Sequence, residues 1–185
     1  MERKGIRTKN IEKIKSNLFV ALLSVVIVIC SRISIPTVIP FTLQSFGVFL
    51  AFYLLGGKRG LFCVLLYLAM GLIGLPISAS GLSGFALLFG VTGGYLIGWI
   101  LCGIIVCIFE RCFGDNRKIK LISLTVGTLV CYAVGTAWFV VVCSQNNEAV
   151  GLWSALCTCV FPFVAVDAIK LVVADRIARG IRLNY

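Results

Sequence analysis

Six long apolar runs, separated by short polar or glycine-rich connections, constrain the fold of this chain more than any other feature. They cover Leu18–Cys30, Leu43–Leu55, Leu61–Leu75, Phe85–Phe109, Leu121–Cys143 and Val150–Val173. With 60% hydrophobic residues among 185, the chain has no stretch left over for a soluble domain. A helix rises about 1.5 Å per residue, so the longer runs can cross a hydrocarbon layer roughly 30 Å thick. The sequence predicts an all-α, polytopic membrane protein with six transmembrane helices.

The basic residues predict how these helices are oriented. Fifteen of the seventeen Lys and Arg residues lie before the first run, after the second, after the fourth or after the sixth. Positively charged connections stay on the cytoplasmic side, so both termini are expected there. We divide the chain into a basic cytoplasmic segment (1–17), a six-helix membrane domain (18–179) and a cytoplasmic tail (180–185). Because orientation accounts for the net charge of +10, we expect no nucleic-acid partner.

The second and third runs are too short to span a bilayer alone, since about 13 to 15 helical residues reach only roughly 20 to 23 Å. Backbone that leaves a helix at membrane depth must be buried in protein or line a cavity. The connections Pro36–Thr42 and Ile77–Gly84 both lie on the outer side in the predicted topology. We therefore expect them to fold inward, over a pocket that opens outward.

Two charged residues, Asp167 and Lys170, lie well inside the sixth run. A charge at the centre of a membrane helix costs about 2.5 to 3.5 kcal/mol on the insertion scale, so both should face protein or water. Their spacing places them on one face of a helix. One interpretation is an ion pair that holds the sixth helix to its neighbours. The other is a solute site, in which the ammonium neutralises a ligand carboxylate and the aspartate accepts N–H bonds.

The remaining residues favour binding over catalysis. The chain contains no histidine, and its nine cysteines form no CxxC pair. No side chains are arranged as a nucleophile with its base, so we expect no enzymatic activity, metal or cofactor. Glycine is frequent in Ser78–Trp99, where it permits either close helix packing or close approach of the backbone to a solute.

Several stretches together resemble one family. They are Ile39–Gly60 (IPFTLQSFGVFLAFYLLGGKRG), Leu65–Phe85 (LLYLAMGLIGLPISASGLSGF), Phe89–Trp99 (FGVTGGYLIGW), the pair Gly135 and Trp138, and Pro162–Arg179 (PFVAVDAIKLVVADRIAR). In this order they resemble the BioY family, the biotin-binding S components of energy-coupling-factor (ECF) transporters. The resemblance covers nearly the whole chain.

The resemblance implies an ECF S-component fold, an outward-opening biotin site, and partners in a membrane scaffold subunit and two ATPase subunits. It implies a multi-pass protein of the bacterial cytoplasmic membrane that takes up biotin as substrate. Asp167 and Lys170 would form the polar end of the site, with Lys170 on the carboxylate and Asp167 orienting it or binding the ureido group. The wall or lid would come from Gln44, Gly81, Leu82, Ser83, Gly84, Phe85 and Tyr95.

Three alternatives remain open on sequence alone. The chain could be an S component for another carboxylated vitamin, which competition binding would distinguish. It could be a membrane scaffold that binds no solute, with Asp167 and Lys170 serving only to hold helices together. An intramembrane enzyme is the third alternative, and the absence of histidine argues against it.

Overall fold

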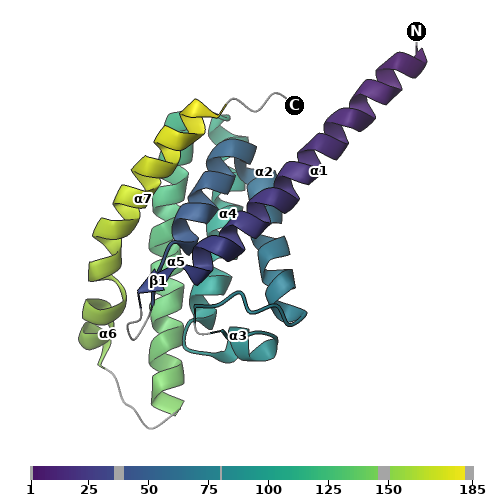
Figure 1. Ribbon diagram of the computed structural model, residues 1–185. Coiled ribbons are helices and arrows are strands. Elements are labelled where there is room, and N and C mark those ends of the chain that lie inside the picture. The colour runs from purple at the N-terminus through teal and green to yellow at the C-terminus, as the bar shows by residue number, and fades with distance from the viewer. Residues whose placement is uncertain (1, 36–39, 80, 146–150, 182–185) are drawn as a thin grey trace.

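The computed structural model describes residues 2–35, 40–79, 81–145 and 151–181, which form a bundle of helices with one short strand pair (Figure 1). By length and composition, five helical segments among these residues could cross a membrane. They are Asn10–Arg32, Gln44–Leu72, Gly93–Phe113, Arg117–Gln145 and Trp153–Gly180. The predicted all-α membrane fold is confirmed, and the second of these segments explains why six apolar runs appear in five helices.

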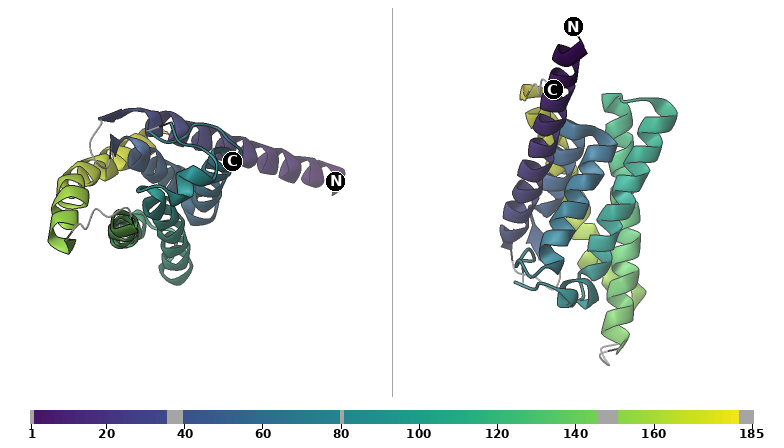
Figure 2. Two further views of the ribbon diagram at one scale, coloured as in Figure 1. Left: turned by 90° about the horizontal axis from the view of Figure 1, so that it is seen from below. Right: turned by 90° about the vertical axis from the view of Figure 1, so that its right-hand side faces the viewer.

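Helix α1 (Glu2–Arg32) begins well before the first apolar run. Its N-terminal half projects away from the bundle, as both side views show (Figures 1 and 2). Its second half packs on the bundle, where Leu23 and Ile27 join the hydrophobic core. The basic segment therefore continues the first membrane helix without a break.

Helix α2 (Gln44–Leu72) reverses direction at Gly56, whose φ of 77° and ψ of 179° interrupt the helix. Before the reversal, Gly47 lies against the backbone of Ile27 in α1. After it, the thiol of Cys63 lies 3.4 Å from the carbonyl oxygen of Val20, nearer the N-terminus of α1. The two arms of α2 consequently run in opposite directions and correspond to the second and third apolar runs (Figure 1).

The fourth apolar run divides into two helices, where the sequence suggested one. Helix α3 (Phe85–Phe89) ends at Gly90, and α4 (Gly93–Phe113) begins three residues later. A Cβ at Gly93 would lie 1.7 Å from the carbonyl oxygen of Leu88, so only glycine fits this tight turn.

The sixth run also divides, into α6 (Leu152–Cys159) and α7 (Phe161–Gly180). Pro162 lies in the first turn of α7. Proline lacks an N–H group and its ring clashes with the carbonyl four residues earlier, which stops α6 from continuing. This break directs α7 across the bundle toward α2.

Helix α5 (Arg117–Gln145) packs closely along α4 through small residues on both helices. An added Cβ at Gly98 would lie 2.7 Å from the sulfur of Cys131, and one at Gly127 would lie 2.5 Å from that of Cys102. Because neither position has room for a side chain, the backbones approach closely. Helix packing is thus the observed role of these glycines.

The basic ends of the helices lie together at one end of the bundle. The N-terminal part of α1, the reversal in α2, the connection from α4 to α5 and the end of α7 all lie there (Figures 1 and 2). Toward the other end, β1 (Ser34–Ile35) pairs antiparallel with β2 (Phe41–Thr42). Arg32, at the end of α1, connects this region to the loop after α2 by donating a 2.8 Å hydrogen bond to the carbonyl oxygen of Ser78. This arrangement agrees with the topology inferred from the charges.

Candidate functional site

A cavity of about 740 Å³, including its open mouth, lies among α2, α4, α5 and α7. Its lining combines aromatic and aliphatic walls with a small group of polar side chains. The lining residues are Pro40, Thr42, Gln44, Ser45, Tyr67, Ser78, Ala79, Leu87, Thr92, Tyr95, Leu96, Trp99, Cys131, Tyr132, Cys159, Phe163, Asp167 and Lys170.

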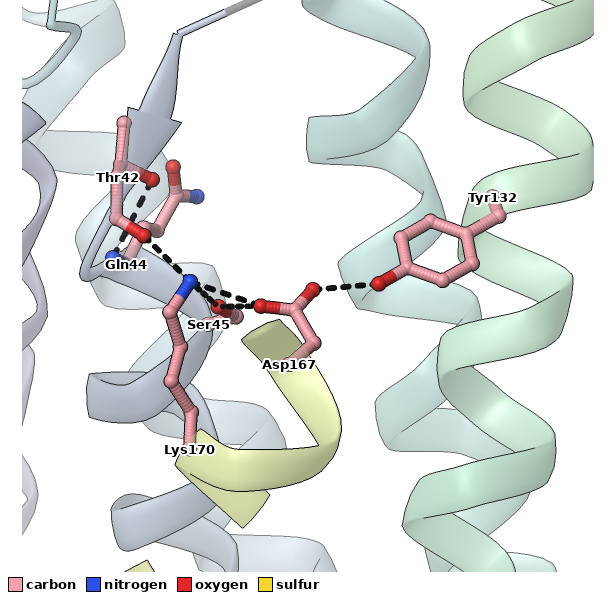
Figure 3. A network of polar contacts seen from close by, with 6 residues as sticks. All are labelled: Thr42, Gln44, Ser45, Tyr132, Asp167 and Lys170. Carbon is pink, nitrogen blue, oxygen red and sulfur yellow. Dashed lines mark hydrogen bonds and ion pairs between the residues drawn. The ribbon is translucent and has the colours of Figure 1, made fainter. Parts of the chain in front are cut away.

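The ammonium group of Lys170 makes three polar contacts at one side of the cavity (Figure 3). It lies 2.8 Å from Oδ1 of Asp167, 3.0 Å from Oγ of Ser45 and 2.7 Å from the carbonyl oxygen of Thr42. An ammonium has three N–H donors, so all of them are satisfied within the protein. Lys170 is only 9% exposed, and these contacts offset the cost of burying its charge.

The carboxylate of Asp167 connects α7 to two other helices. Ser45 of α2 donates a 2.7 Å hydrogen bond to Oδ1, and Tyr132 of α5 donates a 2.6 Å hydrogen bond to Oδ2 (Figure 3). Hydrogen bonds that involve a charged group are shorter and stronger than those between neutral groups. The pair of Asp167 and Lys170 therefore connects helices and also lines the cavity. These contacts are compatible with both interpretations of the sequence, an ion pair that holds α7 to its neighbours and a solute site.

Local structure explains how these groups meet. Asp167 and Lys170 are three residues apart on α7 and so share a face. The pairing of β1 with β2 carries Thr42 to the start of α2, one turn from Ser45. Next to it, the ring of Phe41 stacks on Phe163 of α7 with centroids 4.1 Å apart. This stacking holds the strand pair beside the polar group, which consists of Thr42, Ser45, Tyr132, Asp167 and Lys170.

Gln44 supplies an unused hydrogen-bond donor to the cavity. Its Nε2 atom is buried and has no hydrogen-bond partner among the described residues. Leaving a buried donor unsatisfied costs about 1 to 3 kcal/mol. The amide lies beside Thr42, and thus near Lys170 (Figure 3). A ligand acceptor at this position would satisfy it.

Aromatic rings also line the cavity. Trp99 meets Phe49 edge to face at 5.8 Å, and the hydroxyl of Tyr95 lies 3.2 Å from Oγ1 of Thr136. Gly135 makes room for Tyr95, because a Cβ there would lie 2.3 Å from its ring. Such a wall suits a ligand with an apolar ring system.

Four of the predicted site residues line the cavity: Gln44, Tyr95, Asp167 and Lys170. The loop residues Gly81, Leu82, Ser83, Gly84 and Phe85 do not belong to its lining, and the side chain of Phe85 is 76% exposed. Ser78 and Ala79 line the cavity from that region instead. A role of 81–85 as a lid stays a prediction.

Sequence reasoning missed three participants in the polar group. Ser45 follows Gln44 directly, and Tyr132 is a polar aromatic residue inside the fifth apolar run, so each carried a weak signal. Thr42 contributes its backbone carbonyl, a group that every residue possesses. Its role depends on where the strand pair lies.

The polar group is suited to binding. The Ser45 hydroxyl donates to the Asp167 carboxylate and accepts from the Lys170 ammonium, so it links the two charged groups. In the described part of the chain, no cluster of three His, Cys, Asp or Glu could hold a metal ion.

Comparison with known proteins assigns the chain to a family. Residues 2–185 match the BioY family. The chain belongs to the BioY family. It is 39% identical over 166 residues to the biotin transporter BioY of Thermotoga maritima, covering 89% of this chain and 92% of that protein. It is 36% identical to the biotin transporter BioY of Rhodobacter capsulatus, covering 77% and 78% of the two chains.

A solved structure supports the same assignment for the BioY fold. The crystal structure of the S-component for biotin from an ECF-type ABC transporter superposes with a TM-score of 0.75. It is 30% identical in sequence, and the match covers 92% of each chain. The predicted S-component fold is confirmed, and the BioY relatives are transporters rather than enzymes.

Proposed function

We propose that this chain captures biotin from the outer side of the membrane as the substrate-binding S component of an ECF transporter. The observation that carries the proposal is the composition of the cavity. A buried ion pair, Asp167 with Lys170, lines the cavity together with aromatic side chains and with Gln44, whose Nε2 atom has no partner among the described residues. Family membership directs attention to biotin, and the chemistry of the cavity suits that molecule.

The carboxylate of biotin needs a cation in a site of low dielectric constant. Lys170 supplies one once a ligand oxygen replaces the Thr42 carbonyl, the acceptor that belongs to neither Asp167 nor Ser45. The Gln44 amide, which lines the same cavity, would donate to the same ligand group. Asp167 then keeps its bonds to Ser45 and Tyr132 and orients the ammonium.

The fused rings of biotin would lie along Tyr95, Trp99 and Phe163, which offer apolar surface to the thioether ring. The ureido group carries two N–H donors and one carbonyl, and Ser78, Thr92 and Tyr95 also line the cavity and offer polar atoms. Residues 81–85 would close the outer mouth over the ligand. Their position next to Ser78 and Ala79 supports this part of the proposal.

Release into the cell requires an energy source outside this chain. The sequence contains no GxxxxGK[ST] phosphate-binding motif. We propose that a membrane scaffold subunit and two ATPase subunits supply it, in the cytoplasmic membrane of a bacterium. The solved structural relative comes from an ECF-type ABC transporter, which supports such an assembly.

Equilibrium binding tests the proposal. The purified chain, in detergent micelles, is titrated with labelled biotin and competed with three compounds: biotin, biotin carboxamide and lipoic acid. The carboxamide lacks the negative charge, and lipoic acid has a carboxylate on a similar chain but no ureido group. We expect saturable binding that biotin displaces and that both analogues displace poorly.

Each competitor reports on one part of the site. Displacement by the carboxamide as effective as by biotin would contradict the role of Lys170. Equal displacement by lipoic acid would point to an S component of another carboxylated vitamin. Absence of binding by protein that unfolds cooperatively would contradict solute capture altogether.

A further inference from the structure

A second hollow lies between α5 and α7, behind the wall of the cavity. It measures about 410 Å³, including open space, and shares Tyr132 and Asp167 with the cavity. Its floor is buried, and its rims are exposed apolar side chains such as Leu129 on α5 and Val164 on α7. The complete lining consists of Phe49, Thr125, Thr128, Leu129, Tyr132, Val164, Asp167, Ala168 and Leu171.

This groove faces the bilayer, because the exposed rims belong to two membrane-spanning segments. From Thr125 to Tyr132 it extends over about 10 Å of α5, at 1.5 Å of rise per residue. Its contact surface is almost wholly apolar, since the polar atoms of Tyr132 and Asp167 bond to one another. Hydrocarbon is the material that such a surface contacts in a membrane.

Basic residues lie at the cytoplasmic end of both groove helices. Lys118 is exposed and lies two helical turns from Thr125 on the same face of α5. Arg179 lies three turns from Ala168 on α7. Asp175 accepts a 2.5 Å hydrogen bond from Nε of Arg117, and a nitrogen of Arg179 lies 3.1 Å from its other oxygen. Two arginines, one on each groove helix, thus contact one carboxylate.

We propose that the α5–α7 groove binds one anionic phospholipid of the inner leaflet. An acyl chain occupies the groove, and the phosphate lies against Lys118 and Arg179. The dimensions agree, because Lys118 and Tyr132 are about 21 Å apart along α5. One leaflet contributes about 15 Å of hydrocarbon, half of the bilayer core, and the headgroup adds the remainder.

The bound chain would have a function in this fold. Tyr132 and Asp167 line both the groove and the cavity, so water entering the groove would meet the buried ion pair from the side of the lipid. An acyl chain excludes that water and keeps the local dielectric constant low. The lipid would lie on the other side of Tyr132 and Asp167 from biotin, and the test of this proposal needs no biotin.

Native mass spectrometry of the delipidated protein provides the test. The protein is titrated with dioleoylphosphatidylglycerol, which is anionic. In parallel it is titrated with dioleoylphosphatidylcholine, which is zwitterionic and carries no net charge. We expect one phosphatidylglycerol to bind at least fivefold more tightly, since one cation near a lipid phosphate contributes about that factor. Ala168→Phe fills the groove and should weaken this binding about tenfold. Ile169→Phe, a 65% exposed position on another face of α7, is the matched control and should bind normally.

Charge is tested separately. The double variant Lys118→Gln/Arg179→Gln should lose the preference for phosphatidylglycerol, whereas Lys13→Gln/Lys15→Gln, on the projecting part of α1, should keep it. If Ala168→Phe does not fold, Leu129→Trp replaces it, because the larger side chain fills the groove from the α5 rim. Equal affinity for the two lipids, or unchanged binding to a folded groove variant, overturns the proposal. Full competition by the headgroup glycerophosphoglycerol alone would also overturn it.

Discussion

The hydroxyl of Tyr132 donates a 2.6 Å hydrogen bond to Oδ2 of Asp167, and so joins α5 to α7 at the wall of the cavity. The other oxygen of Asp167 accepts from Ser45 and Lys170. One carboxylate therefore connects α2, α5 and α7 at the site. Its partners can be removed one at a time, which makes the site suitable for mutagenesis.

Tyr132→Phe removes one donor to a buried carboxylate while keeping the ring. Hydrogen bonds to charged groups contribute about 1.5 to 3 kcal/mol, so we expect the free energy of unfolding in micelles to fall by that amount. Tyr95→Phe is the matched control, because its hydroxyl lies beside the neutral Thr136 rather than a carboxylate, and its loss should cost about 0.5 to 1.5 kcal/mol. Equal stability of Tyr132→Phe and the unmodified protein would contradict the role assigned to this bond.

Gln44→Leu should leave folding intact and weaken biotin binding. The Nε2 atom has no partner in the described protein, so its removal sacrifices no internal bond. A lost hydrogen bond to ligand of about 0.5 to 1.5 kcal/mol corresponds to a rise in Kd of roughly twofold to twelvefold. Gln44→Glu keeps the shape but repels a carboxylate, and should weaken binding further. Normal affinity of Gln44→Leu would show that the amide does not contact the ligand.

Variants of Lys170 separate its structural role from its ligand role. Lys170→Met leaves Asp167 buried beside an apolar side chain, which should destabilise the fold by about 3 to 5 kcal/mol. The double variant Asp167→Asn/Lys170→Met removes both charges, so we expect most of that stability to return. Biotin binding should remain lost in both, as measured by equilibrium binding. A stable double variant with normal affinity would mean that the pair only holds helices together.

Gly135→Ala should disturb the aromatic wall. The new Cβ would lie 2.3 Å from the Tyr95 ring, which must move into the cavity or push α4 away from α5. Overpacking of this kind costs about 1 to 3 kcal/mol, and displacement of Tyr95 should raise the Kd for biotin as well. Gly180→Ala is the control, because nothing lies within 4 Å of a Cβ at that position. Unfolding curves and binding isotherms that match those of the control would contradict this view of the wall.

Much of the site could be predicted because its strongest signals are local. Two charges inside an apolar run must face protein, and their spacing places them on one face, so Asp167 and Lys170 were identifiable. The loop residues 81–85 illustrate the limit. The N–H of Gly84 bonds to the carbonyl of Gly71 at 2.8 Å, which holds that part of the loop at the end of α2 and leaves Ser78 and Ala79 on the cavity. A contact between distant backbone groups has no sequence signature.

The sequence by itself determined the membrane character of the chain, the positions of its six apolar runs and the side on which its basic ends lie. These follow from the cost of placing charge and unpaired backbone in hydrocarbon, which acts on each segment separately. Only the tertiary structure decided that Thr42, Ser45 and Tyr132 meet the pair on α7, and that α5 and α7 leave a groove behind the cavity. Those contacts depend on the close α4–α5 packing, the reversal at Gly56 and the break before Pro162, which together set the positions of whole helices.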